Sequence, residues 1–222
     1  MFGDPKSHQA PAAAPPVRSR AEELRASPPM FESGFMDRFT RVHPAVVPAI
    51  FLPVIAVFAY LAFAEVRTYQ VIGLILLGYV AWTLVEYWLH RVVFHFEPEG
   101  GLGARLHWMI HGVHHEHPND PLRLVMPPSA SIPLGLLFAA FFLVLLPYVP
   151  ACGLSAGFFA GYLAYDMTHY AVHHRTPKGP LGRKLRELHM RHHFQDDTTG
   201  FGVSAPWWDY VFGTAPGRRG PR

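Results

Sequence analysis

The chain has 222 residues, of which 50% are hydrophobic and only 16% are charged, whereas a soluble domain carries about a quarter charged residues. This composition indicates a membrane protein, in which the formal charge of +3 fits basic loops at a membrane face and no nucleic-acid partner is expected. The single cysteine, Cys152, excludes disulfides and thiolate metal sites.

The first 36 residues are rich in proline and alanine, and they contain neither apolar periodicity nor a long hydrophobic run. Such a composition is typical of a disordered segment, and it lacks the hydrophobic region of a signal peptide. We therefore expect a disordered Pro/Ala-rich tail over residues 1–36 and one membrane-embedded domain over residues 37–222.

Four apolar stretches follow the tail, at residues 42–63, 71–89, 132–149 and 152–167. Each is close to the roughly 20 residues that a helix needs to cross a bilayer. A short polar turn containing Arg67 joins the first two stretches, and Pro147 and Pro150 separate the last two because proline cannot continue a helix. The pattern predicts an all-α integral membrane fold with four transmembrane helices in two hairpins. A buried hairpin in a soluble core is the alternative, and the scarcity of charges disfavours it.

The basic residues predict the orientation of these spans. Of the 19 lysines and arginines, all but Arg67 fall in segments that a four-span arrangement places on one side of the membrane. The positive-inside rule assigns that side to the cytoplasm.

Histidine is unusually frequent, with 15 residues, and most of them fall into four groups. The members with workable spacing are His90 and His95; His111, His114 and His115; His169 and His173; and His189, His192 and His193. The first and third groups close the second and fourth spans, so two hairpins bring both to the cytoplasmic face. All four groups can then converge in a histidine-rich helical cap just below the bilayer.

The spacing within the groups predicts how ligands are shared. Residues three and four apart lie on one helix face, so the second and fourth groups each present three imidazoles. His90 and His95 would point about 140° apart in an α-helix, which favours ligation of different metals. Ten imidazoles are too many for one ion. We therefore expect a dinuclear site with about five ligands per metal and an open position for O2 or water.

The identity of the metals follows less directly from the sequence. Imidazole suits iron, zinc, copper and nickel alike, but structural zinc usually takes four ligands. Five nitrogens per metal therefore favour two iron ions, which zinc can replace in purified protein.

Two acidic residues within the spans, Glu86 and Asp166, lie four and three residues before His90 and His169. Burying them is costly, and carboxylates that accept the second N–H of an imidazole orient metal ligands. We expect that role for both, with a plain helix-packing hydrogen bond as the alternative. The remaining histidines are expected outside the ligand set: His8, His43, His107, His117 and His174.

The order of these motifs resembles the fatty acid hydroxylase/sterol desaturase superfamily, and the flanking strings are similar to the fatty acid 2-hydroxylases. The resemblance covers about residues 80–214. It is carried by residues 86–95, the motif His111-Gly112-x-His114-His115, and residues 123–128, 165–170, 189–194 and 200–209. It implies a di-iron centre held by the ten histidines. It also implies 2-hydroxylation of a long acyl chain, either of a free fatty acid or of ceramide or dihydroceramide.

Many eukaryotic members of this family carry a cytochrome b5-like haem domain, for which the 36-residue tail is too short. The resemblance then implies a separate electron donor, cytochrome b5-like or ferredoxin-like, together with O2, a long-chain acyl lipid substrate and contact with membrane lipids. The location expected is a bacterial inner membrane, or the endoplasmic reticulum in a eukaryote.

Three other functions compete with this interpretation. A lipid or sterol desaturase of the same superfamily would use similar histidine groups. An intramembrane zinc protease needs His-Glu-x-x-His, which the His115-Glu116-His117 string does not complete. A metal transporter would place its ligands in the middle of the spans rather than at their ends.

Overall fold

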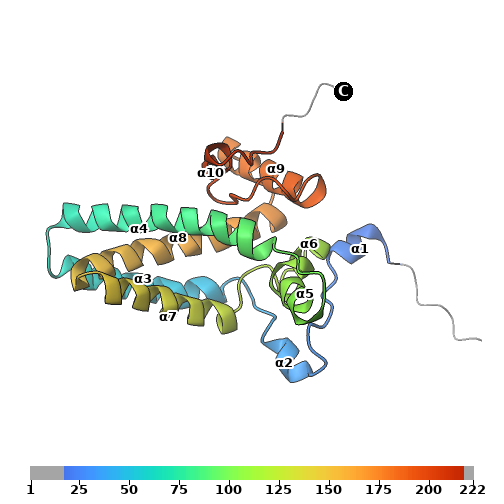
Figure 1. Cartoon of the computed structure of the whole chain (residues 1–222), viewed down its shortest axis with the longest axis horizontal. Coiled ribbons are helices and arrows are strands. Elements are labelled where there is room, and N and C mark those ends of the chain that lie inside the picture. Colours follow the sequence, from blue (N-terminus) through green and yellow to red (C-terminus); the bar gives the residue numbers. More distant parts are fainter. Residues whose placement is uncertain (1–17, 218–222) are drawn as a thin grey trace, which may run out of the picture.

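The computed structural model describes residues 18–217, and within that range every regular element is a helix. Four long helices lie side by side along the long axis of the molecule (Figure 1). They are α3 (Val46–Phe63), α4 (Thr68–Trp88), α7 (Pro128–Leu145) and α8 (Tyr148–His174). The all-helical prediction is confirmed. In the described part of the chain, three helices are long and apolar enough to cross a membrane: α3, α4 with its continuation to Phe94, and α7.

The surface of the bundle is apolar because these helices are apolar on every side. Leu136, Leu137 and Val144 on α7 are all exposed, and only 11% of that span is buried inside the protein. A helix that is hydrophobic all round must bury its outer face in lipid. The bundle therefore meets a bilayer directly.

Helix α8 is the central element, and it packs against α3, α4 and α7. Its contact with α4 is unusually close because glycines remove the side chains between the two backbones. A Cβ at Gly157 would overlap the Ile75 carbonyl oxygen, and a Cβ at Gly78 would overlap that of Leu154. Small residues of this kind let membrane helices approach each other closely.

The fourth predicted stretch, residues 152–167, falls inside α8, but the helix continues to His174. His169 and His173 therefore lie on the same rigid rod as the core residues Phe158 and Tyr162. The apolar stretch ends before the helix does because the last two turns carry histidines, and the predicted helical spacing of His169 and His173 lies in this continuation.

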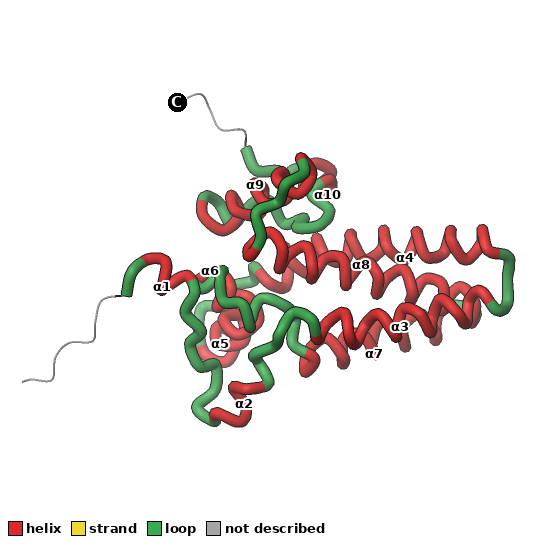
Figure 2. The backbone as a smooth tube through the Cα atoms, turned by 180° about the vertical axis from the view of Figure 1, so that it is seen from behind, coloured by secondary structure: helices red, strands yellow, loops and turns green. Residues whose placement is uncertain are grey.

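Six short elements gather where α4 and α8 end (Figures 1 and 2). They are the π-helix η1 (Leu89–Phe94), α5 (Gly101–His107), the π-helix η2 (Trp108–Gly112), α6 (Val113–Glu116), α9 (Pro180–Phe194) and α10 (Trp207–Val211). We call this assembly the cap. Between them these elements and the end of α8 carry all four predicted histidine groups.

An N-terminal strap, residues 18–41, runs beside the cap and contains α1 (Arg20–Leu24) and α2 (Gly34–Arg38). Helix α1 begins with a capping box in which Ser19 and Glu22 exchange hydrogen bonds. The predicted disorder over residues 1–36 is therefore wrong for residues 19–36. Residues 1–17 lie outside the described part of the chain.

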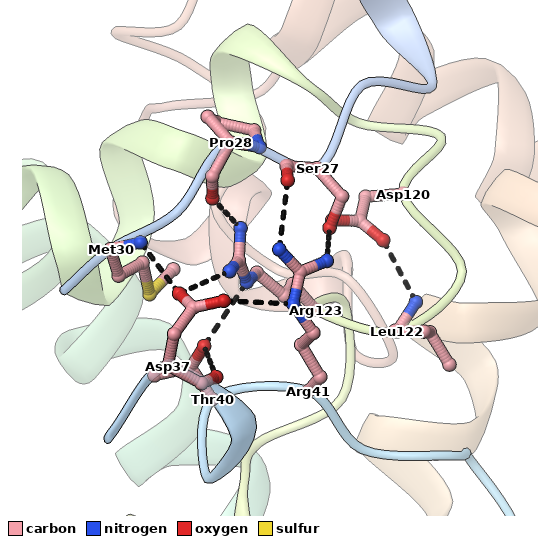
Figure 3. A network of polar contacts seen from close by, with 9 residues as sticks. All are labelled: Ser27, Pro28, Met30, Asp37, Thr40, Arg41, Asp120, Leu122 and Arg123. Atoms are coloured by element: carbon pink, nitrogen blue, oxygen red, sulfur yellow. Dashed lines mark hydrogen bonds and ion pairs between the residues drawn. The ribbon is translucent and has the colours of Figure 1, made fainter. Parts of the chain in front are cut away.

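Polar contacts with a distant loop order the strap (Figure 3). The carboxylate of Asp37 accepts hydrogen bonds from Arg123 at 2.7 Å and from Arg41 at 3.0 Å, and the Ser27 hydroxyl donates to Asp120 at 2.5 Å. Two of these three contacts join residues that are more than 80 positions apart in the sequence. Composition within the strap cannot reveal such contacts, which explains the failed prediction.

Candidate metal centre

The ten predicted histidines converge in two groups of five, on the elements of the cap and the end of α8. Group A consists of His90, His95, His111, His115 and His192. Group B consists of His114, His169, His173, His189 and His193. Within each group, one nitrogen from every residue lies within 4.8 Å of the others, and most of the side chains are buried.

Histidines outside these groups make other contacts. His107 bonds to the Phe94 carbonyl at 2.8 Å, His117 bonds to the Glu23 carbonyl at 2.6 Å, and His174 packs on the Tyr170 ring. His43 is exposed at the start of α3, and His8 lies outside the described residues. None of the four described histidines that were expected outside the ligand set is a member of either group.

His90 and His95 lie in the same group, contrary to the prediction that they point apart. The difference arises because η1 is a π-helix rather than an α-helix. In a π-helix the backbone hydrogen bond joins residues five apart, and here the His95 N–H donates to the His90 carbonyl at 3.2 Å. Residues five apart then come onto one face, so both imidazoles point to one centre.

Two segments of the chain, η2 with α6, and α9, carry three of these histidines each, and both segments divide them between the two groups. His111 and His115 lie in group A, and His114 lies in group B. On α9 the pair four apart, His189 and His193, lies in group B, while the third histidine of that helix lies in group A. Helices α6 and α9 therefore each contribute to both centres, which fixes the two groups relative to each other.

The distances between nitrogens fit metal ligands. Neighbouring Nε2 atoms lie 3.0–3.3 Å apart in group A and 2.8–3.1 Å apart in group B. With metal–nitrogen bonds of about 2.1 Å, ligands at right angles lie about 3.0 Å apart and tetrahedral ligands about 3.4 Å apart. The spacing fits ligands at right angles around an ion with five or six positions.

Two backbone carbonyls orient imidazoles of group A. The Nδ1 of His90 lies 2.6 Å from the Phe201 oxygen, and the Nδ1 of His192 lies 2.7 Å from the Thr199 oxygen. A carbonyl can only accept, so the proton of each neutral ring sits on Nδ1 and the lone pair sits on Nε2. Both lone pairs face the centre of the group, as a metal site requires.

Burial also keeps the imidazoles free of protons. Desolvation, followed by the nearby His192 and His95, lowers the pKa of His115 to about 2. Desolvation, together with His192 and His107, lowers the pKa of His95 to about 3. At neutral pH these rings are uncharged, and their lone pairs are available to a cation.

Glu86 and Asp166 do not contact imidazoles, so their predicted role as orienting partners of His90 and His169 is wrong. Glu86 accepts hydrogen bonds from the Ser204 backbone N–H at 2.7 Å and from the Ser204 hydroxyl. Asp166 accepts from the Met126 N–H at 3.3 Å and from the Tyr162 hydroxyl at 3.4 Å. The alternative, a structural hydrogen bond, describes both.

The residues that orient His90 and His192 are Phe201 and Thr199, which the sequence did not suggest. A backbone carbonyl is present at every residue, so nothing in the side chain of Phe201 or Thr199 marks it as a partner. The only sequence signal in this region is the string at residues 200–204, which resembles the family but does not mark a carbonyl partner.

An apolar groove lies between the long helices. Its walls include Leu89 at the start of η1, Leu134 of α7 and Phe158 of α8, with Met126 and Tyr162 toward the cap. Leu89 directly precedes His90. The groove is therefore an apolar surface whose lining includes the residue next to a group A histidine.

Apolar helices long enough to cross a bilayer, together with two groups of five imidazoles, define a membrane protein with histidine clusters suitable for metal binding. A family model described as fatty acid hydroxylase matches residues 75–214, a span that contains all ten histidines. The chain belongs to the fatty acid hydroxylase family, and it is an oxidoreductase of the hydroxylase type.

Relatives of known name support this assignment. The chain is 40% identical over 192 residues to the dihydroceramide fatty acyl 2-hydroxylase FAH2 of Arabidopsis thaliana. The matched region covers 86% of this chain and 81% of that protein. It is 37% identical over 201 residues to the ceramide very long chain fatty acid hydroxylase SCS7 of Saccharomyces cerevisiae, covering 89% of this chain and 52% of that one. The solved structure of full-length scs7p, in which only the hydroxylase domain is visible, matches with a TM-score of 0.80 and 37% identity, covering 85% and 72% of the two chains.

Proposed function

We propose that this chain uses O2 and two externally supplied electrons to hydroxylate carbon 2 of a long acyl chain, at a dinuclear iron centre held by the ten histidines. The observation that carries the proposal is the pair of five-imidazole groups at the end of an apolar helical bundle. When bound, the irons would supply the activation of O2, which no side chain can provide. Zinc can take their place in purified protein.

The protein itself positions the substrate and excludes water from the reacting carbon. The groove beside Leu89 would receive part of the apolar tail, while a polar headgroup would stay at the membrane face. Carbon 2 lies next to the carbonyl that joins tail and headgroup, so it falls at the depth where the groove meets group A. Buried imidazoles and apolar walls exclude water from that position.

The acceptor we propose is the N-acyl chain of a ceramide or dihydroceramide, or the free fatty acid. The support comes from the relatives, because FAH2 is named for dihydroceramide and SCS7 for ceramide. A separate cytochrome b5-like or ferredoxin-like protein would deliver the electrons.

The orientation we propose counts α8 as a fourth span, so that α4 and α8 both end at the cytoplasmic face. Eighteen of the 19 lysines and arginines then lie on that side, which agrees with the positive-inside rule. The membrane would be a bacterial inner membrane, or the endoplasmic reticulum in a eukaryotic cell.

The test is lipid mass spectrometry of cells that express the chain and of cells that do not. We expect acyl chains that gain one oxygen atom, located at carbon 2 by fragmentation. Loss of two hydrogens without a gain of oxygen would instead identify a desaturase. Unchanged lipids in cells that also contain a working electron donor would contradict the proposal.

A further inference from the structure

The two histidine groups differ in how the outer nitrogens of their rings are held. In group A, His90 and His192 donate to the carbonyls of Phe201 and Thr199. In group B, the Nδ1 atoms of His173, His189 and His193 are buried, and no acceptor for them exists within residues 18–217. Removing such a partner from a metal-ligating imidazole typically costs about 10- to 100-fold in metal affinity.

The carbonyls that serve group A belong to a turn, residues 199–204, which a buried carboxylate holds in place. Asp209, 1% exposed, accepts hydrogen bonds from the Phe201 N–H at 2.8 Å and the Gly202 N–H at 2.9 Å. It also accepts from the Thr214 hydroxyl at 2.8 Å. A charged acceptor with three donors fixes this backbone strongly.

Other contacts complete the turn. Gly200 has a positive φ of 76°, a conformation that suits glycine, and its N–H donates to the Thr214 carbonyl at 2.9 Å. Glu86 holds the far end of the turn through Ser204. Group A is thus backed by a rigid frame, and group B has no equivalent among the described residues.

We propose that the two metal sites bind their ions with unequal affinity, that group A is the tighter site, and that Asp209 is its positioning residue. Asp209 touches no imidazole. It acts by aiming the carbonyls of Phe201 and Thr199 at His90 and His192. The inference rests on the proposed metal centre, but it is independent of the lipid that the enzyme modifies.

The experiment measures the release of Zn2+ from the purified full chain to a coloured chelator. The wild type should lose two equivalents in two phases of similar amplitude, separated by at least about tenfold in rate. His114→Ala should remove the fast phase and leave the slow one unchanged. His95→Ala should remove the slow phase and leave the fast one unchanged.

Asp209→Asn tests the positioning role. It should speed the slow phase by about tenfold and leave the fast phase at its wild-type rate. The control, Glu65→Gln, changes an exposed carboxylate in the turn between α3 and α4 and should alter neither phase. If Asp209→Asn does not fold, Thr214→Val removes one of the three donors and should give a smaller effect in the same phase.

Release of both ions in one phase, or assignment of the slow phase to group B, would overturn the inference. An equal effect of Asp209→Asn on both phases would show a merely structural role for this residue. Two zinc equivalents in a chain that hydroxylates no lipid would refute the proposed function and leave the unequal sites intact. Failure to bind two ions would refute both.

Discussion

At the scale of single residues, the arrangement around His95 shows why a cation belongs in group A. Its Nε2 lies 3.0 Å from that of His192 and 3.3 Å from that of His90. Both neighbours carry their proton on Nδ1, so both present lone pairs, and one N–H of His95 cannot satisfy the two of them together. An ion at the centre satisfies all three. Unpaired polar atoms in a buried cluster are otherwise expensive.

Replacing one imidazole should therefore empty at least one site. We expect His192→Ala to lose about one equivalent of metal or more and to form no hydroxylated lipid, because group A loses both a ligand and its link to the Thr199 carbonyl. Elemental analysis and lipid mass spectrometry measure the two effects, and membrane insertion should be retained. The control is His43→Ala, which removes an exposed histidine outside both groups and should change neither quantity. Full metal content and product from His192→Ala would refute the ligand assignment.

The identities of the ten converging imidazoles could be predicted from the sequence. Histidine is rare in most proteins, whereas here it recurs in groups with helical spacing. The partners of those imidazoles could not be predicted. Glu86 has the chemistry of an orienting carboxylate and sits one helical turn before His90, yet it bonds to Ser204. Backbone carbonyl oxygens orient these imidazoles instead, and because every residue has a backbone carbonyl, the sequence cannot identify them.

At the scale of elements, the type of helix, α or π, decides which side chains lie on the same face. The interval of five between His90 and His95 separates them in an α-helix and unites them in the π-helix η1. Sequence reasoning assumed the commoner helix, so it missed this pairing. Apolar length, in contrast, located α3 and α4 to within four residues at each end. It placed the third helix four residues too late, because residues 148–150 belong to the first turn of α8.

The contact between α4 and α8 depends on glycine in a way that can be measured. Gly157→Ala should destabilise the protein by roughly 1–3 kcal/mol, because the added Cβ would overlap the Ile75 carbonyl and force the helices apart. Gly73→Ala on α4 is the matched control, since nothing lies within 4 Å of its Cβ position. Thermal unfolding in detergent compares the two. Equal unfolding temperatures for both variants would show that the contact is looser than described.

At the scale of the whole molecule, the strap connects the beginning of the chain to the loop that follows the second histidine group. Arg123 is the anchor, with a side chain 2% exposed, and it pairs with Asp37. The Val42 N–H also donates to the Leu122 carbonyl at 2.6 Å, which sets where α3 begins. The Pro/Ala-rich composition predicted disorder here. The contact that orders the strap is with Arg123, 86 residues from Asp37, and the composition of the strap itself cannot reveal it.

Breaking that anchor should loosen the strap. We expect Asp37→Asn to cost about 3 kcal/mol, because it leaves the buried Arg123 guanidinium without a counter-charge. Limited proteolysis should then cut within residues 18–41 faster than in the wild type. Glu32→Gln, at an exposed position on the same strap, is the control and should be cut at the wild-type rate. Equal cleavage of Asp37→Asn and wild type would contradict the anchoring role.

The same residue gives the strap a pH dependence. Desolvation raises the pKa of Asp37, but the Met30 N–H and the guanidiniums of Arg41 and Arg123 lower it by more, so it lies below its ordinary value. A carboxyl with a depressed pKa in the folded state contributes stability above its unfolded pKa and loses it as the pH falls toward the folded value. In wild type, strap cleavage should therefore rise only in strong acid.

Both centres depend on helix α9, which supplies His192 to one group and His189 and His193 to the other. Neither centre is complete until this late part of the chain has left the ribosome, by which time every long helix of the bundle has already been made. The metals that we propose for these groups would therefore be loaded after the long helices have been synthesised. A chain cut short before α9 would contain all four long helices and yet complete neither histidine group.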